Sequence, residues 1–537
     1  MKNLVFDVNV VLDLWLERQP EARLLQIAAL IDCQRTGTAL GWIASPSLHV
    51  LEYLAYRQFK HEGADPAEAK QTVKQLLAKL QQQLRPLSAF GFQQHNALLA
   101  QTDLEDAQLV AAASVLQGPT AIVTNDKRFA TAGSNLVQLK PAEVADWLGQ
   151  SKPSDNLNFV DLQTQQDAIR PQLEQHLHRV LEHGQYILGP EVGELEQRLA
   201  AYTGARHCIS VSSGTEALLI SLMALGIGPG DEVITTPFTF VATAEVIVLL
   251  GAKPVFVDIE PDTCNIDATL IEAKLSDKTK AIMPVSLYGQ PADMDAINAI
   301  AAHHGNIPVI EDAAQSFGAT YKGRQSGNLS TLGCTSFFPS KPLGGYGDGG
   351  AIFTSDDALA QACRELRVHG QSDRYRHTRV GVGGRMDSLQ CAVVLAKLDR
   401  FEHEIAQRQA VARRYHELLS ASSRQAKTPT PATATHAIRL LPWPSDERTS
   451  VFAQYTLLVE NRQAQHDKLN AAGIPTAVHY PIPLNQQPAY AHLCCPGCTP
   501  VAQRIAERVI SLPMHADLAP GDQSRIVAAL LGEQAKT

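Results

Sequence analysis

The stretch 335–350, TSFFPSKPLGGYGDGG, decides how the larger part of the chain is interpreted. Its Lys341 follows two aromatic residues and precedes the segment 344–350, in which five of seven residues are glycine. Glycine allows bare backbone to approach a ligand closely. A lysine removed from water in such a setting has a lowered pKa and becomes a nucleophilic amine, whereas a lone lysine is ordinarily a solvated surface charge. Lys341 is therefore a candidate for covalent chemistry if suitable partners stand elsewhere.

A turn that suits a phosphate lies earlier in the chain. The run SVSSGTEALLI places Ser213, Gly214 and Thr215 where a strand turns into a helix. The free backbone N–H groups at that end of a helix, together with the helix dipole, favour an anion. Taken alone, the run indicates only a helix N-cap.

An acidic residue stands at the end of a later strand. The run VIEDAAQ places Asp312 at the C-terminal end of an apolar strand, where sheets of this kind carry ligand-contacting residues. A carboxylate there keeps a pyridinium nitrogen protonated, which makes pyridoxal phosphate (PLP) an electron sink. A strand-edge acid alone predicts little, but its order with the phosphate turn and Lys341 favours a PLP site.

Short β-prone runs alternate with helical patterns on both sides of a Gly-, Pro- and Ser-containing stretch at 149–157. This alternation predicts α/β domains, with a parallel sheet in the small first domain and a doubly wound sheet in the second. A long helical pattern over 395–421 then leads into a smaller α+β lobe. The predicted divisions are 1–148, a linker at 149–157, 158–395 and 396–537.

Composition limits the classes of function. The chain has 537 residues, which is too long for one core. A net charge of −9 argues against a large surface for nucleic acid, although it leaves room for a small one. Nine cysteines without dense spacing fit a reducing compartment, so we expect a cytoplasmic protein. The longest apolar run, 246–252, is too short to span a bilayer, so no membrane partner is expected.

From about Leu157 onward the chain resembles the DegT-type sugar-nucleotide aminotransferases, which belong to fold type I of the PLP enzymes and share the aspartate-aminotransferase-like fold. The motifs that carry the resemblance are SGTEAL, TPFTFVATAE, EDAAQSFGA, SFFPSKPLGGYGDGGA and VHYPIPLNQQPAY.

The resemblance implies a role for each residue of the site. Lys341 is the catalytic residue and holds PLP as a Schiff base, Asp312 contacts the pyridine nitrogen, and Gln315 borders the ring hydroxyl. Phe240 stacks on the ring. Residues implied to bind the phosphate are Gly214, Thr215 and Ser336. Once the amino donor displaces Lys341, the freed amine can move a proton between the substrate and the cofactor.

The substrate follows from a narrower resemblance. Several motifs are most similar to the branch that aminates C3 of UDP-2-acetamido-2-deoxy-3-oxo-glucuronate for bacterial surface polysaccharide such as O-antigen, and the resemblance implies glutamate as the amino donor. A carboxylate-bearing substrate favours a planar bidentate donor, so Arg385 is the candidate, with His479 and Tyr480 nearby. Taken alone, Arg385 is equally well explained by a structural salt bridge.

The chain departs from the family at one position. Many relatives carry an asparagine in the segment VGVGGRMD that reaches the cofactor phosphate of a partner subunit, and this chain has Gly383 there. That contact is in doubt, at a cost of about 1–3 kcal/mol for a charged hydrogen bond. A homodimer is still implied, because neighbouring subunits complete active sites of this fold.

Four acids in the first domain stand where a PIN-type nuclease carries its own, so a PIN-like α/β/α domain is the predicted fold. Each acid alone is explained by a helix cap or turn. Clustered carboxylates would bind Mg²⁺ or Mn²⁺ and activate water for cleavage of RNA. The predicted metal ligands are Asp7, Glu52, Asp106 and Asp126.

Three overall hypotheses follow. The first is a working aminotransferase with an appended PIN-like domain. In the second, the protein is chiefly an RNA-cleaving toxin or regulator, and its PLP domain serves as a scaffold or sensor. In the third, the first domain is a metal-free interaction module. The complete set of PLP-site residues favours the first over the second.

Overall fold

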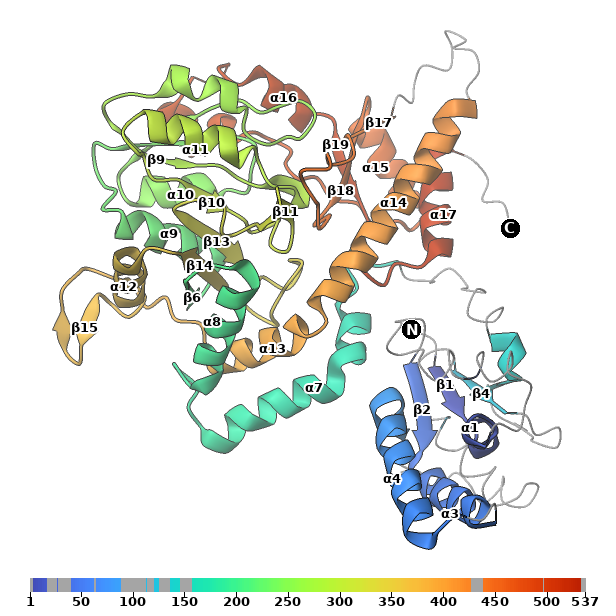
Figure 1. Cartoon of the computed structure of the whole chain (residues 1–537). Coiled ribbons are helices and arrows are strands. Elements are labelled where there is room, and N and C mark those ends of the chain that lie inside the picture. The colour runs from blue at the N-terminus through green and yellow to red at the C-terminus, as the bar shows by residue number, and fades with distance from the viewer. Residues whose placement is uncertain are drawn as a thin grey trace. The chain divides into compact units, whose positions relative to one another are not determined.

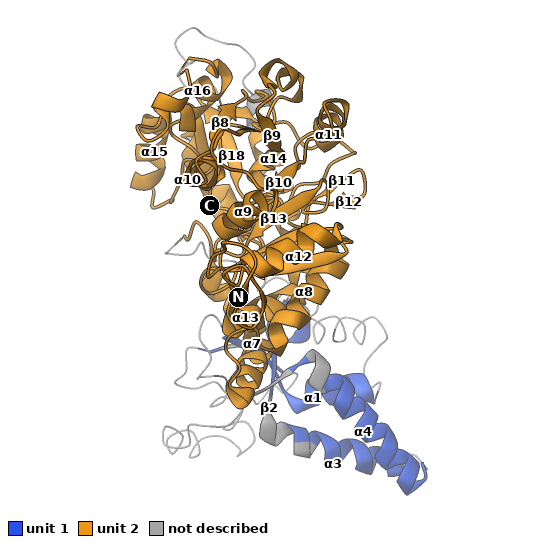
Figure 2. Ribbon diagram, turned by 90° about the vertical axis from the view of Figure 1, so that its left-hand side faces the viewer, with its two compact units in different colours: residues 1–152 blue, residues 153–537 orange. Residues whose placement is uncertain are grey.

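The structure is a computed structural model, and it describes residues 3–16, 27, 40–61, 64–87, 113, 120–124, 136–144, 157–425, 438–495 and 497–532. The chain divides into two compact units, residues 1–152 and 153–537 (Figure 2). The border between the units falls inside the segment 149–157 that the sequence indicates as a linker.

Unit 1 contains a five-stranded sheet in which every pair is parallel, in the order β3-β2-β1-β4-β5. The strands are β1 (Asn3–Phe6), β2 (Leu40–Ala44), β3 (Arg85–Leu87), β4 (Thr120–Val123) and β5 (Val137–Leu139). The described helices are α1 (Val8–Trp15), α3 (Ser45–His61), α4 (Pro66–Gln83) and the 3-10 turn Pro141–Glu143. The parallel sheet agrees with the alternation in the sequence.

One expected strand of unit 1 is shorter than its apolar run. Residues 4–12 form a continuous β-prone run, yet the strand ends at Phe6 and α1 begins at Val8. Asp7 causes the change, because its side chain accepts a hydrogen bond from Asn9 N at 3.4 Å and caps the helix. A short apolar run does not by itself distinguish a buried strand from a buried helix.

The large sheet of unit 2 has seven strands in the part of the chain that the structure describes. They are β6 (His207–Val211), β7 (Glu232–Thr235), β8 (Lys253–Phe256), β9 (Thr279–Met283), β10 (Ile310–Asp312), β13 (Leu332–Ser336) and β14 (Gly350–Thr354). Two ladders, β8-β7-β9 and β10-β13-β14-β6, are joined by parallel bridges from Ile282 to Val309 and from Val285 to Asp312. All pairs are parallel except those of β14, which is antiparallel to both of its neighbours.

Helices cover both faces of this sheet (Figure 1). They are α8 (Pro190–Thr203), α9 (Gly214–Ala224), α10 (Ala242–Leu249), α11 (Met294–His303), α12 (Asp357–Leu366) and α13 (Ser388–Leu398), and α7 (Leu162–His183) packs on α13. Ile209 and Ile352 pack with α9, α10 and α12, whereas their neighbours Cys208 and Phe353 pack with α8 and α13. Because successive strand residues point to opposite faces, this split shows a doubly wound sheet, as expected. The expected helix at 270–275 is instead two 3-10 turns, Ala268–Leu270 and Glu272–Lys274, since so short a helix is marginal.

The rest of unit 2 forms a smaller α+β lobe, which the long orange helix α14 connects to the sheet (Figure 1). Its three antiparallel strands are β17 (Ile438–Leu440), β18 (Tyr455–Val459) and β19 (Val509–Leu512). The helices are α14 (Phe401–Gln425), α15 (Arg462–Ala471), α16 (Pro500–Ala506) and α17 (Pro520–Leu531). Unit 2 also has short elements, several of them outside this lobe. They are β11 (Thr320–Tyr321), β12 (Arg324–Gln325), β15 (Gln371–Asp373), β16 (Arg376–His377) and the 3-10 turns Leu287–Gly289, Leu484–Gln486 and Ala491–Leu493.

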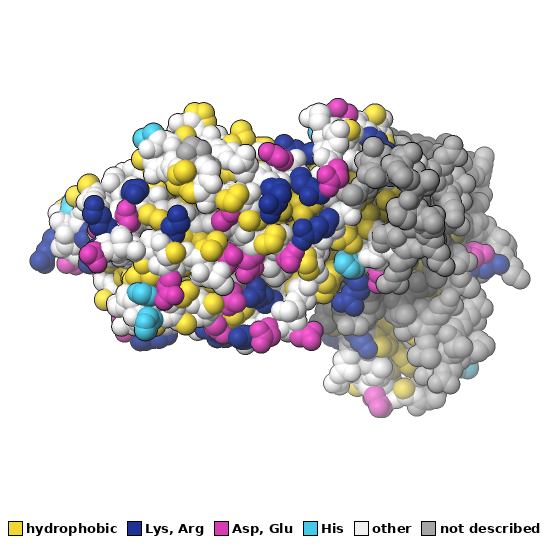
Figure 3. Space-filling model, turned by 90° about the horizontal axis from the view of Figure 1, so that it is seen from above, with side chains coloured by type: hydrophobic (Ala, Val, Ile, Leu, Met, Phe, Trp, Pro, Cys, Tyr) yellow, Lys and Arg dark blue, Asp and Glu magenta, His cyan; other side chains and the backbone are white. Residues whose placement is uncertain are grey.

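Two surface properties bear on the partners. Within the described part of the chain, every helix is too short or too polar to cross a bilayer. On the face drawn in Figure 3, basic and acidic side chains lie interspersed over the described residues.

Candidate active site

Lys341 lies in the turn that follows β13. Its backbone N–H donates to Phe338 O at 2.9 Å, and burial lowers the pKa of its side-chain amine, against the opposing effect of the Asp312 carboxylate. The glycines after Lys341 allow the backbone of this segment to pack closely against the residues before the lysine. A Cβ at Gly344 would lie 2.5 Å from Pro339 O. The glycine-rich segment therefore folds tightly against the turn that carries Lys341.

Asp312 ends β10 at the carboxyl edge of the large sheet. Its side chain is buried, and it accepts hydrogen bonds from Thr243 Oγ1 at 2.9 Å and from Ala314 N at 3.2 Å. Burial raises the pKa of Asp312, while these two hydrogen bonds and the charge of Lys341 oppose the rise. Two fixed donors orient the carboxylate and leave it lone pairs for a further partner.

Three polar side chains form a linked set beside Asp312. Gln315 Oε1 accepts from Tyr288 N at 2.9 Å, and Gln315 Nε2 donates to Tyr480 Oη at 3.2 Å. The Tyr288 hydroxyl donates to the backbone oxygen of His479. These bonds connect the sheet edge to the segment that carries His479 and Tyr480, two residues expected at the substrate.

Burial shapes the ionisation of that segment. It lowers the pKa of His479 to about 4, with a smaller contribution from the Lys341 charge, so the imidazole is neutral near pH 7. His479 Nδ1 lies 3.0 Å from Ser511 Oγ. Burial also raises the pKa of the Tyr480 phenol, which therefore remains a hydrogen-bond donor. The site thus presents neutral, oriented polar groups beside one amine and one carboxylate.

The phosphate turn precedes α9. Ser213 caps the helix by accepting from Glu216 N at 3.0 Å, and the helix begins at Gly214. A Cβ at Gly214 would lie 2.6 Å from Ser336 Cβ, so only glycine fits between the turn and the end of β13. Thr215 is half-buried in the first turn. The arrangement brings together the three residues expected to bind a phosphate.

The residues that gather here fit PLP. The helix N-terminus and the glycine-lined turn suit its phosphate, and buried Asp312 suits its ring nitrogen. The ring of Phe240 is 52% exposed and lies 6.3 Å from the ring of Tyr480, centroid to centroid. A planar ring therefore has an aromatic surface to lie on, next to the amine of Lys341.

Arg385 occupies a segment that is bonded to the phosphate turn, because Ser212 N donates to Gly384 O at 2.9 Å. Arg385 is half-buried, and Gly383 beside it is exposed and pairs with Val368. A Cβ at Gly383 would lie 3.2 Å from His369 Cε1. The substrate role of Arg385 stays a prediction.

The sequence interpretation missed three residues of the site. Thr243 bonds Asp312, and Tyr288 bonds Gln315. Glu216 has a buried Oε2 without a hydrogen bond in the described structure, and burial raises its pKa. Tyr288 follows β9, the strand next to β10, so the rule that sites lie at the carboxyl edge of the sheet indicates it. Thr243 and Glu216 give no comparable signal. Each lies in the first turn of a helix, where an ordinary helix residue would fit equally well.

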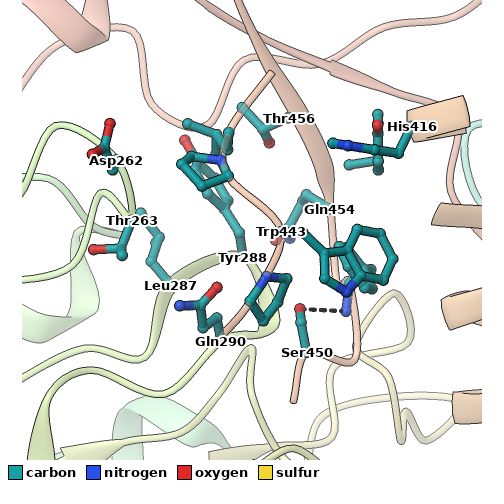
Figure 4. Close-up of a pocket in the computed structure, with 15 residues that line it drawn as sticks. Asp262, Thr263, Leu287, Tyr288, Gln290, His416, Trp443, Ser450, Gln454 and Thr456 are labelled. Atoms are coloured by element: carbon teal, nitrogen blue, oxygen red, sulfur yellow. Dashed lines mark hydrogen bonds between the residues drawn. The ribbon is translucent and has the colours of Figure 1, made fainter. Parts of the chain in front are cut away.

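A pocket lies behind Tyr288, between the sheet end and the smaller lobe (Figure 4). Trp443 and Gln454 line its other side. Tyr288 therefore lines this pocket and, through its backbone N–H, also holds Gln315. The polar set of the active site is in this way continuous with the junction of the two parts of unit 2.

Two of the four expected metal ligands lie in the described part of unit 1. Asp7 is buried at the end of β1 and accepts from Thr124 Oγ1 at 2.6 Å, whereas Glu52 is half-buried on α3. Asp106 and Asp126 lie outside the described residues. Among the residues that are described, no three His, Cys, Asp or Glu side chains come together as a metal site.

Comparison with known proteins decides the family. The family model described as the DegT/DnrJ/EryC1/StrS aminotransferase family matches residues 167–531. The chain belongs to this family. It is accordingly a PLP-dependent sugar aminotransferase, and the residues built around Lys341 are its candidate active site.

Individual relatives narrow the comparison. The chain is 57% identical, over 70% of its length and 99% of the relative, to a UDP-2-acetamido-2-deoxy-3-oxo-D-glucuronate aminotransferase of Pseudomonas aeruginosa. It is 39% identical, over 69% of its length and 97% of the relative, to a UDP-N-acetyl-3-dehydro-alpha-D-glucosamine 3-aminotransferase of Acidithiobacillus ferrooxidans.

Solved structures agree in fold. An aminotransferase of this family from Brucella abortus has a TM-score of 0.64 and 40% identity, over 70% of this chain and 99% of that one. A Bacillus subtilis protein solved with the bound cofactor PMP has a TM-score of 0.64 and 27% identity, over 75% of this chain and 94% of that one. These likenesses confirm the expected fold type I architecture.

Proposed function

We propose that the chain transfers an amino group from glutamate to the 3-keto group of UDP-2-acetamido-2-deoxy-3-oxo-glucuronate. One observation carries the chemistry: the amine of Lys341, whose pKa is lowered by burial, shares its site with buried Asp312 and with the Gln315–Tyr480 pair. The substrate rests on the 57% identity to the Pseudomonas aeruginosa relative. The product would serve bacterial surface polysaccharide, including O-antigen.

Each residue has a distinct task in this proposal. PLP supplies an electron sink for the bond that breaks at Cα of the donor. Lys341 holds the cofactor at rest and, once released, carries the proton to and from Cα. Asp312, oriented by Thr243, keeps the ring nitrogen protonated. Gln315 would border the ring hydroxyl and Phe240 would stack on the ring. The residues that would hold the phosphate are Gly214, Thr215 and Ser336.

Arg385 is proposed to read the carboxylate of the uronate, with His479 and Tyr480 beside the sugar. The test compares two sugar nucleotides that differ at C6, the 3-oxo-glucuronate and the 3-oxo-glucosamine form. We expect Arg385→Gln to raise KM for the uronate by roughly 10- to 100-fold, as for a lost charged hydrogen bond, and to leave KM for the neutral sugar within about twofold. An equal rise for both sugars would remove this role.

The proposed division assigns 158–395 to the cofactor-binding domain and 396–537 to the small domain, after a linker at 149–157 and the first domain at 1–148. A homodimer is also proposed. Large apolar side chains of unit 2 are exposed, and they include Ile187, Phe338, Tyr375 and Val380. Where such side chains gather in a patch, they mark protein interfaces. Mass photometry at nanomolar concentration should give a mass near twice 58.2 kDa.

For residues 1–148 we propose a PIN-like nuclease that uses Mg²⁺ or Mn²⁺. Support comes from Asp7, which directly follows the central strand of a parallel sheet and accepts a hydrogen bond from Thr124, the residue that follows the neighbouring strand β4. Asp7, Glu52, Asp106 and Asp126 are the proposed ligands, and cytoplasmic RNA is the proposed substrate. RNA cleavage in Mn²⁺ should be lost in Asp7→Asn. If wild-type RNase activity is high while amino transfer is absent, the toxin or regulator alternative is the better account.

A further inference from the structure

A small enclosed cavity lies against Lys341, apart from the residues assigned to the cofactor. Its walls come from the first turn of α7, the first two turns of α14 and the segment that follows β19. Gln165, Arg408 and His515 line it together with Lys341. About 10 Å³ of the cavity is open to the centre of a water molecule, which is close to the minimum for one enclosed water.

Four buried polar atoms of residues on these walls have no hydrogen-bond partner in the described structure. Glu404 Oε1 is ion-paired with Arg400 Nε at 3.3 Å, which leaves Gln165 Oε1, Arg408 Nε and His515 Nδ1. Arg408 is 4% exposed and His515 is 7% exposed. The other end of the Gln165 amide is fixed, because Nε2 donates to Glu404 Oε2 at 2.5 Å. A buried polar atom without a partner loses the hydrogen bonds that water would give it in the unfolded chain. Three such atoms on one cavity indicate a ligand that satisfies all of them.

The three atoms require both kinds of hydrogen bond. Gln165 Oε1 accepts and Arg408 Nε donates. Burial lowers the pKa of His515 to about 4, so its ring is neutral near pH 7 and supplies either role at Nδ1, depending on the tautomer. A neutral molecule that both donates and accepts matches this set, and an enclosed water typically makes about three hydrogen bonds.

Ions fit the cavity less well. Acidic groups that face it or stand directly behind it are Asp161, Glu404 and Asp517, and basic ones are Lys341, Arg400, Arg408 and His403. An anion would meet the carboxylates, and a cation would meet the guanidinium of Arg408. Water avoids both repulsions and fits the available space.

We propose that one water molecule is bound between Gln165 Oε1, Arg408 Nε and His515 Nδ1, and that through it these three residues hold the turn that carries Lys341, which lines the cavity with Pro339 and Lys341. The water is proposed independently of the reaction, whereas its effect on turnover rests on the function proposed above. Gln165, Arg408 and His515 are then positioning residues, because they act on Lys341 through its turn.

A crystal structure of the PLP-loaded full chain at about 1.6 Å resolution tests the site directly. A water within about 3.2 Å of all three atoms is the expected result. An empty cavity, a bound ion, or rotamers that pair the three groups with one another would overturn the proposal. This outcome does not depend on whether the proposed substrate is correct.

Two variants at one position test the positioning role. Asn places a polar atom near the position of His Nδ1, whereas Leu places none there. His515→Leu should lose the water, lower kcat roughly tenfold at unchanged KM, and shift the pH at which the visible absorbance of the bound cofactor changes. His515→Asn should retain the water, kcat and the titration.

Gln325→Leu is the matched control, since Gln325 Oε1 is likewise buried without a partner but lies on β12. It should leave kcat and the titration unchanged. Equal losses in the Leu and Asn variants, or none in either, would contradict the positioning role. Absence of amino transfer in the wild type would instead refute the proposed function, and the crystal structure would still decide the water site.

Discussion

The two units each carry an acid at the carboxyl end of a central strand of a sheet. Asp7 directly follows β1 and Asp312 ends β10, and each accepts a hydrogen bond from a threonine hydroxyl, Thr124 at 2.6 Å and Thr243 at 2.9 Å. Both are buried. The same local arrangement therefore occurs twice in one chain.

The two acids differ in what surrounds them. Asp312 shares its site with the buried amine of Lys341 and with a linked glutamine and tyrosines. Asp7 also caps α1, which explains it by folding alone. An acid at a strand end is thus weak evidence for function until a second chemical group, placed from a distant part of the sequence, shares its site.

Replacement of Lys341 should lower amino-transfer activity more than any other substitution. Lys341→Ala should lower amino transfer by at least about 10⁴-fold, because one amine serves as both the cofactor anchor and the proton carrier. Lys397→Met is the control. Lys397 is also buried, and burial lowers its pKa to about 8, but it lies over the ring of Tyr346. Steady-state kinetics should show Lys397→Met within about threefold of wild type; similar losses in both variants would show that burial alone, not position, explains Lys341.

The next largest difference in activity is expected between variants of two adjacent carboxylates, Asp312 and Glu311. Asp312→Asn should lower kcat by roughly 10²- to 10³-fold, since the amide no longer stabilises a protonated ring nitrogen. Glu311 is fully buried on the other face of β10, where it accepts from Ser326 Oγ at 2.6 Å and Gly327 N at 2.8 Å. Glu311→Gln should lower the free energy of unfolding by about 1–3 kcal/mol and leave kcat nearly intact. Steady-state kinetics and thermal unfolding of both variants measure these effects. A large loss of kcat in Glu311→Gln with little loss in Asp312→Asn would contradict this account.

The buried side chain of His515 predicts how the stability of unit 2 depends on pH. Burial lowers the pKa of His515 from 6.5 to about 4. The unfolded chain therefore binds more protons than the folded one between these values, and the free energy of unfolding falls as the pH drops through that window. The loss from this residue is about 3 kcal/mol. Thermal unfolding at pH 7 and pH 4.5 should show a smaller drop for His515→Asn than for wild type; an identical drop would contradict the assignment.

The smallest effect is expected in unit 1. Thr124→Val removes the hydroxyl that donates to Asp7 and should lower the free energy of unfolding of this unit by about 1 kcal/mol. If Asp7 serves only as a helix cap, RNA cleavage in Mn²⁺ will be absent from wild type and variant alike. If it binds a metal, cleavage will be present in wild type and lost in Asp7→Asn.

Much of the cofactor site followed from the sequence, because its motifs stand at strand ends and helix starts. Lys341, Asp312, Gln315 and Gly214 converge as expected, although their individual roles rest on the family resemblance. The antiparallel direction of β14 did not follow, since a buried strand has the same apolar pattern in either direction.

Other features depend on contacts between distant segments. Tyr288 has a positive φ of 58° and reaches Gln315 and His479, which lie 27 and 191 residues away. Its motif gives no sign of that geometry. The end of β1 at Phe6 is a different case, because a single cap at Asp7 decides between strand and helix.

The central claim is that Lys341 holds the cofactor covalently. Reduction of the PLP-loaded protein with borohydride, followed by proteolysis and mass spectrometry, locates the modified amine. The account predicts the pyridoxyl group on the peptide that contains Lys341, and no such peptide from Lys341→Ala. Modification at Lys397 or another lysine instead, or an unmodified Lys341 in protein that retains amino transfer, would contradict it.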